Sequence, residues 1–120
     1  MNIEELFARL NNYEPLTTED SFCAAFALLD KYYRESDDDK VCSLLSDMDP
    51  YLFKNSLSAD PAVYGDWCRI IAAYQKDGRV EYLQMLFGLK ELLAFYQKEF
   101  GFEHQNAIDH FASVIEKTGE

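Results

Sequence analysis

Apolar residues recur at intervals of three and four along most of this chain, and this spacing constrains the fold more than any other feature. Such spacing places apolar side chains on one face of an α-helix, whereas a strand needs apolar and polar residues to alternate. No segment shows sustained alternation. Glycine and proline, which number 5 and 3, fall mostly where helices should begin or end. The sequence therefore predicts an all-α single domain over residues 1–120, a bundle of five to seven helices with short loops.

The first half of the chain predicts three helices and one short turn or helix. Residues 2–10 form the first helix, and Thr17 or Thr18 can cap the second, which ends at the acidic run 35–39. That run caps the third helix, and Asp49-Pro50 starts the short turn or helix. The side chains expected to face inward are Ile3, Leu6, Phe7 and Leu10 in the first helix, Phe22, Phe26, Leu29 and Tyr33 in the second, and Val41, Leu44, Leu45 and Met48 in the third.

The second half of the chain predicts three longer helices. Asp60-Pro61 is a cap followed by proline, which loses no hydrogen bond at the first helical position, and Gly78 is the expected C-cap. Residues 79–101 are apolar on nearly all sides, so this helix should lie at the centre of the bundle and end at Gly101. A last helix covers 106–117. The expected inward residues are Val63, Trp67, Ile70, Ile71 and Tyr74 after Asp60-Pro61, and Ala107, Phe111 and Val114 or Ile115 in the last helix.

The cysteines and the apolar runs indicate a cytoplasmic protein. No apolar run is long enough to span a bilayer, and residues 1–10 do not resemble a signal peptide. Three cysteines, an odd number, stand far apart and form no C-x-x-C pair. Buried, reduced thiols are typical of such a pattern. They are Cys23, Cys42 and Cys68.

We expect a non-enzymatic protein with no catalytic, cofactor or metal site. The sequence contains no nucleophile elbow and no glycine-rich phosphate loop. His104 and His110 are six residues apart, so a helix would turn them to different sides, and exposed or capping roles are expected. The acidic segment 37–49 lacks the glycine and glutamate positions that an EF-hand calcium loop requires.

The charge of the chain predicts a basic partner. Acidic residues number 22 and basic residues 11, which gives a formal net charge of −11. Residues 1–60 hold 13 acidic and 5 basic residues, so the excess lies mainly in the first half. A surface of this sign repels phosphate backbones and anionic lipid, and we therefore expect neither nucleic-acid nor membrane binding. The alternative is that the acidity only keeps the protein soluble.

The acidic excess is greatest from Glu35 to Asp49, and tyrosines flank this segment. Carboxylates beside tyrosines suit the lysines and arginines of a basic protein. The alternative is a solvated loop that caps a helix beside half-buried tyrosines. Tyr64 and Tyr96 are further interface candidates, and exposed aromatic residues on the last two helices would also allow a homodimer. The residues predicted to bind the partner are Tyr33, Asp37, Asp38, Asp39, Asp47, Asp49 and Tyr51.

The stretch "ADPAVYGDWCRII" resembles small bacterial immunity proteins of polymorphic-toxin and contact-dependent growth inhibition systems. In that pattern an Asp-Pro-Ala start precedes an acid-Trp pair on a helix, and "LKELLAFYQKEFG" looks like the long helix that often closes such proteins. The similarity covers about a third of the chain. The matching positions are Asp60, Pro61, Ala62, Asp66 and Trp67, with a looser match at Tyr64.

The resemblance implies a cytoplasmic antidote that binds the C-terminal domain of one cognate toxin and blocks its active site or substrate path. Many such toxins are nucleases with basic clefts, which an acidic cover complements. The resemblance leaves Trp67 as a core anchor. The alternative function is an acidic helical adaptor or regulatory protein, or a nucleic-acid mimic, without a toxin partner.

Overall fold

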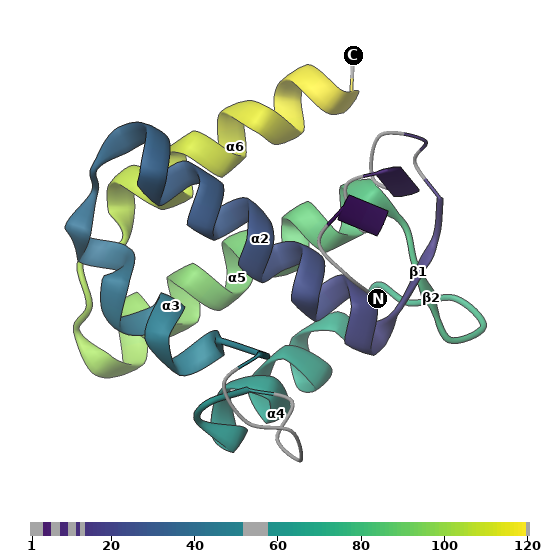
Figure 1. Ribbon diagram of the computed structural model, residues 1–120, viewed down its shortest axis with the longest axis horizontal. Helices are drawn as coiled ribbons and strands as arrows, with labels where there is room; N and C mark the ends of the chain where they lie inside the picture. The colour runs from purple at the N-terminus through teal and green to yellow at the C-terminus, as the bar shows by residue number, and fades with distance from the viewer. Residues whose placement is uncertain (1–3, 6–7, 10–11, 13, 52–57, 120) are drawn as a thin grey trace.

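The computed structural model describes residues 4–5, 8–9, 12, 14–51 and 58–119. Within them the chain forms five α-helices, one short 3-10 helix and one pair of two-residue strands (Figure 1). The predicted all-α bundle is confirmed. The elements run β1 (Leu16–Thr17), α2 (Thr18–Ser36), the 3-10 helix (Asp39–Val41), α3 (Cys42–Met48), α4 (Pro61–Ile71), β2 (Arg79–Val80), α5 (Tyr82–Phe100) and α6 (Gln105–Gly119).

Two predicted segments are only partly described. Residues 4–5 and 8–9 have helical backbone, within the predicted first helix 2–10. Its expected apolar face, Ile3, Leu6, Phe7 and Leu10, lies outside the described residues. The predicted turn or helix after Asp49-Pro50 also lies largely outside them, since residues 52–57 are not described.

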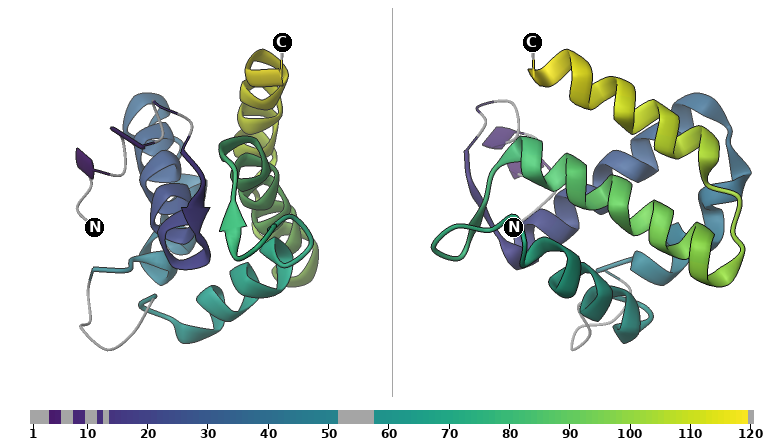
Figure 2. Two further views of the ribbon diagram at one scale, coloured as in Figure 1. Left: turned by 90° about the vertical axis from the view of Figure 1, so that its right-hand side faces the viewer. Right: turned by 180° about the vertical axis from the view of Figure 1, so that it is seen from behind.

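Helix α5 is the centre of the bundle, as its nearly apolar circumference predicts. It packs against α2, α4 and α6. Figure 2 shows α2 in one layer, α5 and α6 together in the other, and α4 lying across one end. A helix with three neighbouring helices can keep only a narrow strip in solvent, which explains why its polar residues are confined to a stripe.

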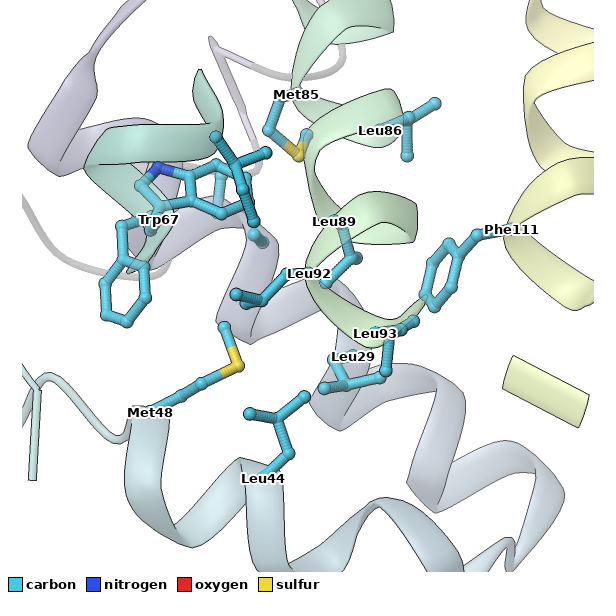
Figure 3. Packing of buried hydrophobic residues seen from close by; sticks show 14 of the residues in the cluster. Leu29, Leu44, Met48, Trp67, Met85, Leu86, Leu89, Leu92, Leu93 and Phe111 are labelled. Carbon is cyan, nitrogen blue, oxygen red and sulfur yellow. The ribbon is translucent and has the colours of Figure 1, made fainter. Parts of the chain in front are cut away.

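The core is a single cluster of buried residues to which every described α-helix contributes side chains. In Figure 3 the labelled side chains of α5, Met85, Leu86, Leu89, Leu92 and Leu93, point toward residues of the surrounding helices. All five of these side chains are completely buried. The residues that meet them include Leu29 from α2, Leu44 and Met48 from α3, Trp67 from α4 and Phe111 from α6.

The helix ends confirm three of the predicted signals. Thr17 caps α2, because its side-chain oxygen accepts a hydrogen bond from the Asp20 N–H at 3.1 Å. Asp60 caps α4 in the same way through the Ala62 N–H at 3.0 Å, with proline at the first helical position. Gly101 ends α5 with a φ of 75°, a conformation that favours glycine.

Gly78 does not cap α4, and this prediction was wrong. The helix ends at Ile71, and Gly78 lies in a tight turn with Asp77. Both turn residues have positive φ, 52° and 74°, and Lys76 and Arg79 exchange backbone hydrogen bonds at 2.8 and 2.9 Å across them. This is a type I′ hairpin turn, for which Asp-Gly is a preferred pair. This turn places β2 beside β1, and the two strands pair antiparallel with Leu16 opposite Val80 and Thr17 opposite Arg79.

Most of the residues predicted to face inward are buried, with a few exceptions that lie near the surface. Phe26, Tyr33 and Tyr74 are only half-buried, and Tyr74 lies beyond the end of α4. Val114 and Ile115, of which one was expected to face inward, are both half-buried as well. The cysteines are half-buried rather than enclosed, and all three are free thiols. No helix in the described part of the chain is long and apolar enough to cross a membrane.

Candidate protein-binding surface

Three consecutive aspartates lie in the connection between α2 and α3, and two of them face solvent. Asp37 ends α2 with a φ of 56°, and its N–H donates to the Tyr33 carbonyl at 2.8 Å. Its side chain is exposed, as is that of Asp39. Aspartate tolerates this left-handed conformation better than most residues do, which suits it to the position that ends α2.

Asp38 serves the local structure. Its Oδ2 accepts a hydrogen bond from the Tyr32 hydroxyl at 2.6 Å, and its Oδ1 accepts one from the Lys40 N–H at 3.2 Å, which caps the 3-10 helix. Burial, followed by this carboxylate, raises the pKa of Tyr32 to about 12. The alternative reading of this segment, a loop that caps a helix, therefore describes Asp38, whereas Asp37 and Asp39 are exposed.

The other two predicted aspartates lie at the far end of α3. Asp47 is the sixth residue of this helix and Asp49 directly follows it. A helix of this length separates its ends by about 10 Å. Asp49 Oδ1 accepts from the Tyr51 N–H at 2.9 Å, and burial, followed by the nearby Asp60, raises the pKa of Asp47. The predicted acidic surface thus consists of two groups rather than one.

Each predicted tyrosine accompanies one of these groups. Tyr33 is half-buried beside Asp37 and Asp39, and a hydrogen bond with Cys42 is the main cause that raises the pKa of Tyr33. Tyr51 is 49% exposed, and its ring meets the ring of Phe26 edge-on at 6.2 Å. Each ring packs against the protein on one side and is accessible to solvent on the other, an arrangement that is common for tyrosine in interfaces.

The connection between α2 and α3 is tied to the connection between α5 and α6. Lys40 forms an ion pair with Glu103, which raises the pKa of Lys40 and lowers that of Glu103. Both side chains are exposed, so the pair contributes little stability. The two connections lie at the same end of the bundle (Figure 1, left), and Asp37 and Asp39 therefore share this end with residues of the α5–α6 connection.

The sequence predicted exposed aromatic residues on the last two helices, but not the aromatic cluster that forms at this end. Phe95, Tyr96, Phe100 and Phe102 contact one another around the end of α5. Phe100 is 60% exposed, more than any other large apolar side chain among the described residues. The signal was the run of aromatic residues in "FYQKEFGF" around the expected helix end at Gly101. Tyr96, expected in an interface, is buried instead, and Tyr64 is half-buried.

Neither histidine lies in a metal-binding group formed by the described residues. His104, expected to be exposed or capping, is completely buried, and its Nδ1 lies 3.1 Å from the Leu93 carbonyl oxygen. The His110 ring packs against the Tyr32 ring in a tilted arrangement, with 4.8 Å between ring centroids. Among the described residues no three His, Cys, Asp or Glu side chains are grouped so that they could hold a metal ion.

No protein-family model, curated protein or solved structure matches this chain.

Proposed function

We propose that this protein binds and neutralises a basic toxin domain, as a cytoplasmic immunity protein does. The observation that carries this proposal is the pair of exposed carboxylates, Asp37 and Asp39, beside Tyr33 at one end of the bundle. The whole chain carries a net charge of −11, so the long-range field and the local surface have the same sign.

Such a surface favours association with a positively charged protein. Opposite charges steer two proteins together and can raise the association rate by one to three orders of magnitude at low salt. The acidic protein would cover the active site or substrate path of the toxin. A nuclease cleft, which must attract phosphate, presents the complementary charge.

The resemblance around Asp60 and Trp67 supplies the class of partner. In the structure these two residues support the fold rather than the surface: Asp60 caps α4, and Trp67 is completely buried. This arrangement agrees with a role for the motif in holding α4 in place while other residues meet the toxin. The resemblance, and not the geometry, is the reason to name a toxin.

Co-expression tests the proposal. The chain is produced together with the C-terminal domain of a toxin encoded next to it, and cell survival and co-purification are measured. Survival with a stable one-to-one complex is expected. A matched control uses the Asp37→Asn/Asp39→Asn double variant, which should rescue less well at the same expression level. Toxicity that persists beside soluble protein, without a complex, would contradict the proposal and favour an adaptor without a toxin partner.

A further inference from the structure

The aromatic cluster at the end of α5 is an accessible platform. Phe100 lies 5.1 Å from Tyr96, 6.1 Å from Phe95 and 6.5 Å from Phe102, measured between ring centroids. The inner rings support Phe100 while more than half of its surface faces solvent. Large apolar side chains that are held in place and exposed are typical centres of protein interfaces.

The platform is fixed before any partner arrives. Tyr96 is buried, and its hydroxyl donates to Asp66 Oδ2 on α4 at 2.7 Å. Gly101 turns the chain directly after Phe100, and Phe102 then returns toward Tyr96, with 6.3 Å between the two ring centroids. A platform held by neighbouring rings loses little conformational entropy on binding.

One edge of the cluster already binds a guanidinium group from the same chain. The Cζ of Arg69 lies 4.8 Å from the centroid of the Phe95 ring, and its Nη2 lies 3.6 Å from Asp66 Oδ1. An aromatic ring with a carboxylate beside it suits arginine, because the planar guanidinium can stack on the ring and bind the carboxylate at the same time. Phe95 and Asp66 are thus engaged from within, whereas the exposed surface of Phe100 is open to a partner.

Two exposed carboxylates, Glu99 and Glu103, flank Phe100 and Phe102 in the sequence. Glu99 lies three and four positions after Tyr96 and Phe95 on α5, so it shares their side of the helix, and Glu103 follows Phe102. Glu99 has no ion-pair partner among the described residues, and Glu103 pairs only with the exposed Lys40.

We propose that Phe100, backed by Phe102 and flanked by Glu99 and Glu103, receives an arginine side chain from the surface of a basic protein. This inference rests on the proposed function for the basic character of the partner, and it adds the point at which that partner is anchored. The Lys40–Glu103 ion pair joins the platform to the connection that carries Asp37 and Asp39. The exposed aspartates would steer the partner, and Phe100 would hold it.

A second copy of this chain suits the platform poorly. A symmetric pair places the same surface of each copy against the other, so the carboxylates around one Phe100 would face those around its mate. Like charges brought together in an interface cost free energy, and two chains of net charge −11 also repel at longer range. A cationic partner removes both penalties.

The experiment compares hexa-arginine amide with hexa-lysine amide as probes, by isothermal titration calorimetry at low salt on the full chain. Both peptides carry the same charge, so a preference for arginine reports stacking and planar hydrogen bonding. The wild type should bind the arginine peptide roughly two- to fivefold more tightly, the range expected for an exposed cation–π contact. Phe100→Tyr should keep this ratio, whereas Phe100→Leu and Phe100→Ala should bring it close to one.

Because Phe100 is exposed, these variants should fold as the wild type does, and circular dichroism checks this directly. Asp39→Asn, the charge control, should weaken both peptides while leaving their ratio unchanged. A wild-type ratio near one, or an unchanged ratio in Phe100→Leu, would overturn the proposal, as would a wild-type dimer in sedimentation that Phe100→Ala dissociates. The test uses no toxin, so its failure is distinguishable from failure of the proposed function.

Discussion

Trp67 Nε1 donates a hydrogen bond to Ser21 Oγ at 3.1 Å, and this contact joins α4 to α2 inside the core. Both residues are completely buried, and the Ser21 hydroxyl in turn donates to the Thr18 carbonyl at 2.7 Å. The only tryptophan of the chain is therefore held by packing and by a polar contact. It holds α4, the helix that carries Asp66 and Arg69, in a fixed position against α2.

Replacement of Ser21 should destabilise the protein. In Ser21→Ala the indole N–H loses its acceptor and stays buried, which costs about 1–3 kcal/mol of unfolding free energy. Urea unfolding followed by tryptophan fluorescence measures the change. Ser43→Ala, an exposed serine on α3, is the control and should change stability by less than about 0.5 kcal/mol. Equal effects of the two variants would show that the Ser21–Trp67 contact contributes nothing.

Gly88 allows α5 to approach α4 closely. A Cβ atom at this position would lie 2.5 Å from Ile71 Cδ1 and 3.1 Å from Trp67 Cη2. Because Ile71 is completely buried and the indole ring is rigid, Gly88→Ala should lower the unfolding free energy by about 1–2 kcal/mol despite the better helix propensity of alanine.

The control for Gly88 is Gly65→Ala on the exposed side of α4, where a Cβ would meet nothing within 4 Å. This variant should stabilise the protein by about 0.5–1 kcal/mol through helix propensity alone. Thermal unfolding distinguishes the two. Stabilisation by both alanines would contradict the close packing described between α4 and α5.

Asp38 and Asp39 should respond differently to the same substitution. Asp38→Ala removes the cap of the 3-10 helix and the acceptor of the Tyr32 hydroxyl, which together cost about 1–2 kcal/mol. Asp39→Ala removes an exposed carboxylate and should change stability by less than about 0.5 kcal/mol. Chemical denaturation of both variants provides the comparison. Equal stability losses would mean that the contacts of Asp38 do not matter.

Asp47 should make stability depend on pH. Burial, and secondly Asp60, raise its pKa in the folded state above the ordinary 3.8, so the folded protein holds this proton more tightly than the unfolded chain. The resulting stability is complete below about pH 3.8 and is lost as the pH rises through the folded-state pKa. Asp47→Asn should therefore stabilise the protein at pH 7, by less than about 1 kcal/mol, and have no such advantage in acid.

The control for Asp47 is Asp39→Asn, which removes the same charge from an exposed site. It separates a local effect of burial from the general relief of a chain with net charge −11. Unfolding free energies of both variants between pH 3 and pH 7 provide the test. A gain at Asp47 that is equal at all pH values, or no larger than at Asp39, would contradict the assigned cause.

The helices were predictable because their signals are local and repeated. Thr17, Asp60 and Gly101 each act within a few residues of their own position, and the apolar spacing of α5 extends over several turns. The pairing of β1 with β2 was not predictable, since two-residue strands are too short to show alternation. Gly78 was wrongly predicted as a helix C-cap because Asp-Gly suits both a helix end and a hairpin turn. Only the pairing with the distant strand Leu16–Thr17 distinguishes the two structures.

The candidate surface was predictable only in part. The excess of acidic residues from Glu35 to Asp49 is visible in the sequence. Which of these residues are exposed is not, because the hydrogen bond from the Tyr32 hydroxyl holds Asp38 in a structural role. The separation of Asp47 and Asp49 from the earlier aspartates follows from the helix between them. The ion pair of Lys40 with Glu103 joins residues that are far apart in the chain, so no local sequence pattern predicts it.

The most direct test is the association rate constant of this protein with the proposed toxin domain, measured by stopped-flow fluorescence over a range of salt concentrations. We predict a rate that falls steeply with salt in the wild type. In the Asp37→Asn/Asp39→Asn variant the rate should be several-fold lower at low salt, with a shallower salt dependence and unchanged stability. An identical rate and salt dependence in the two proteins would contradict the claim that these carboxylates guide binding.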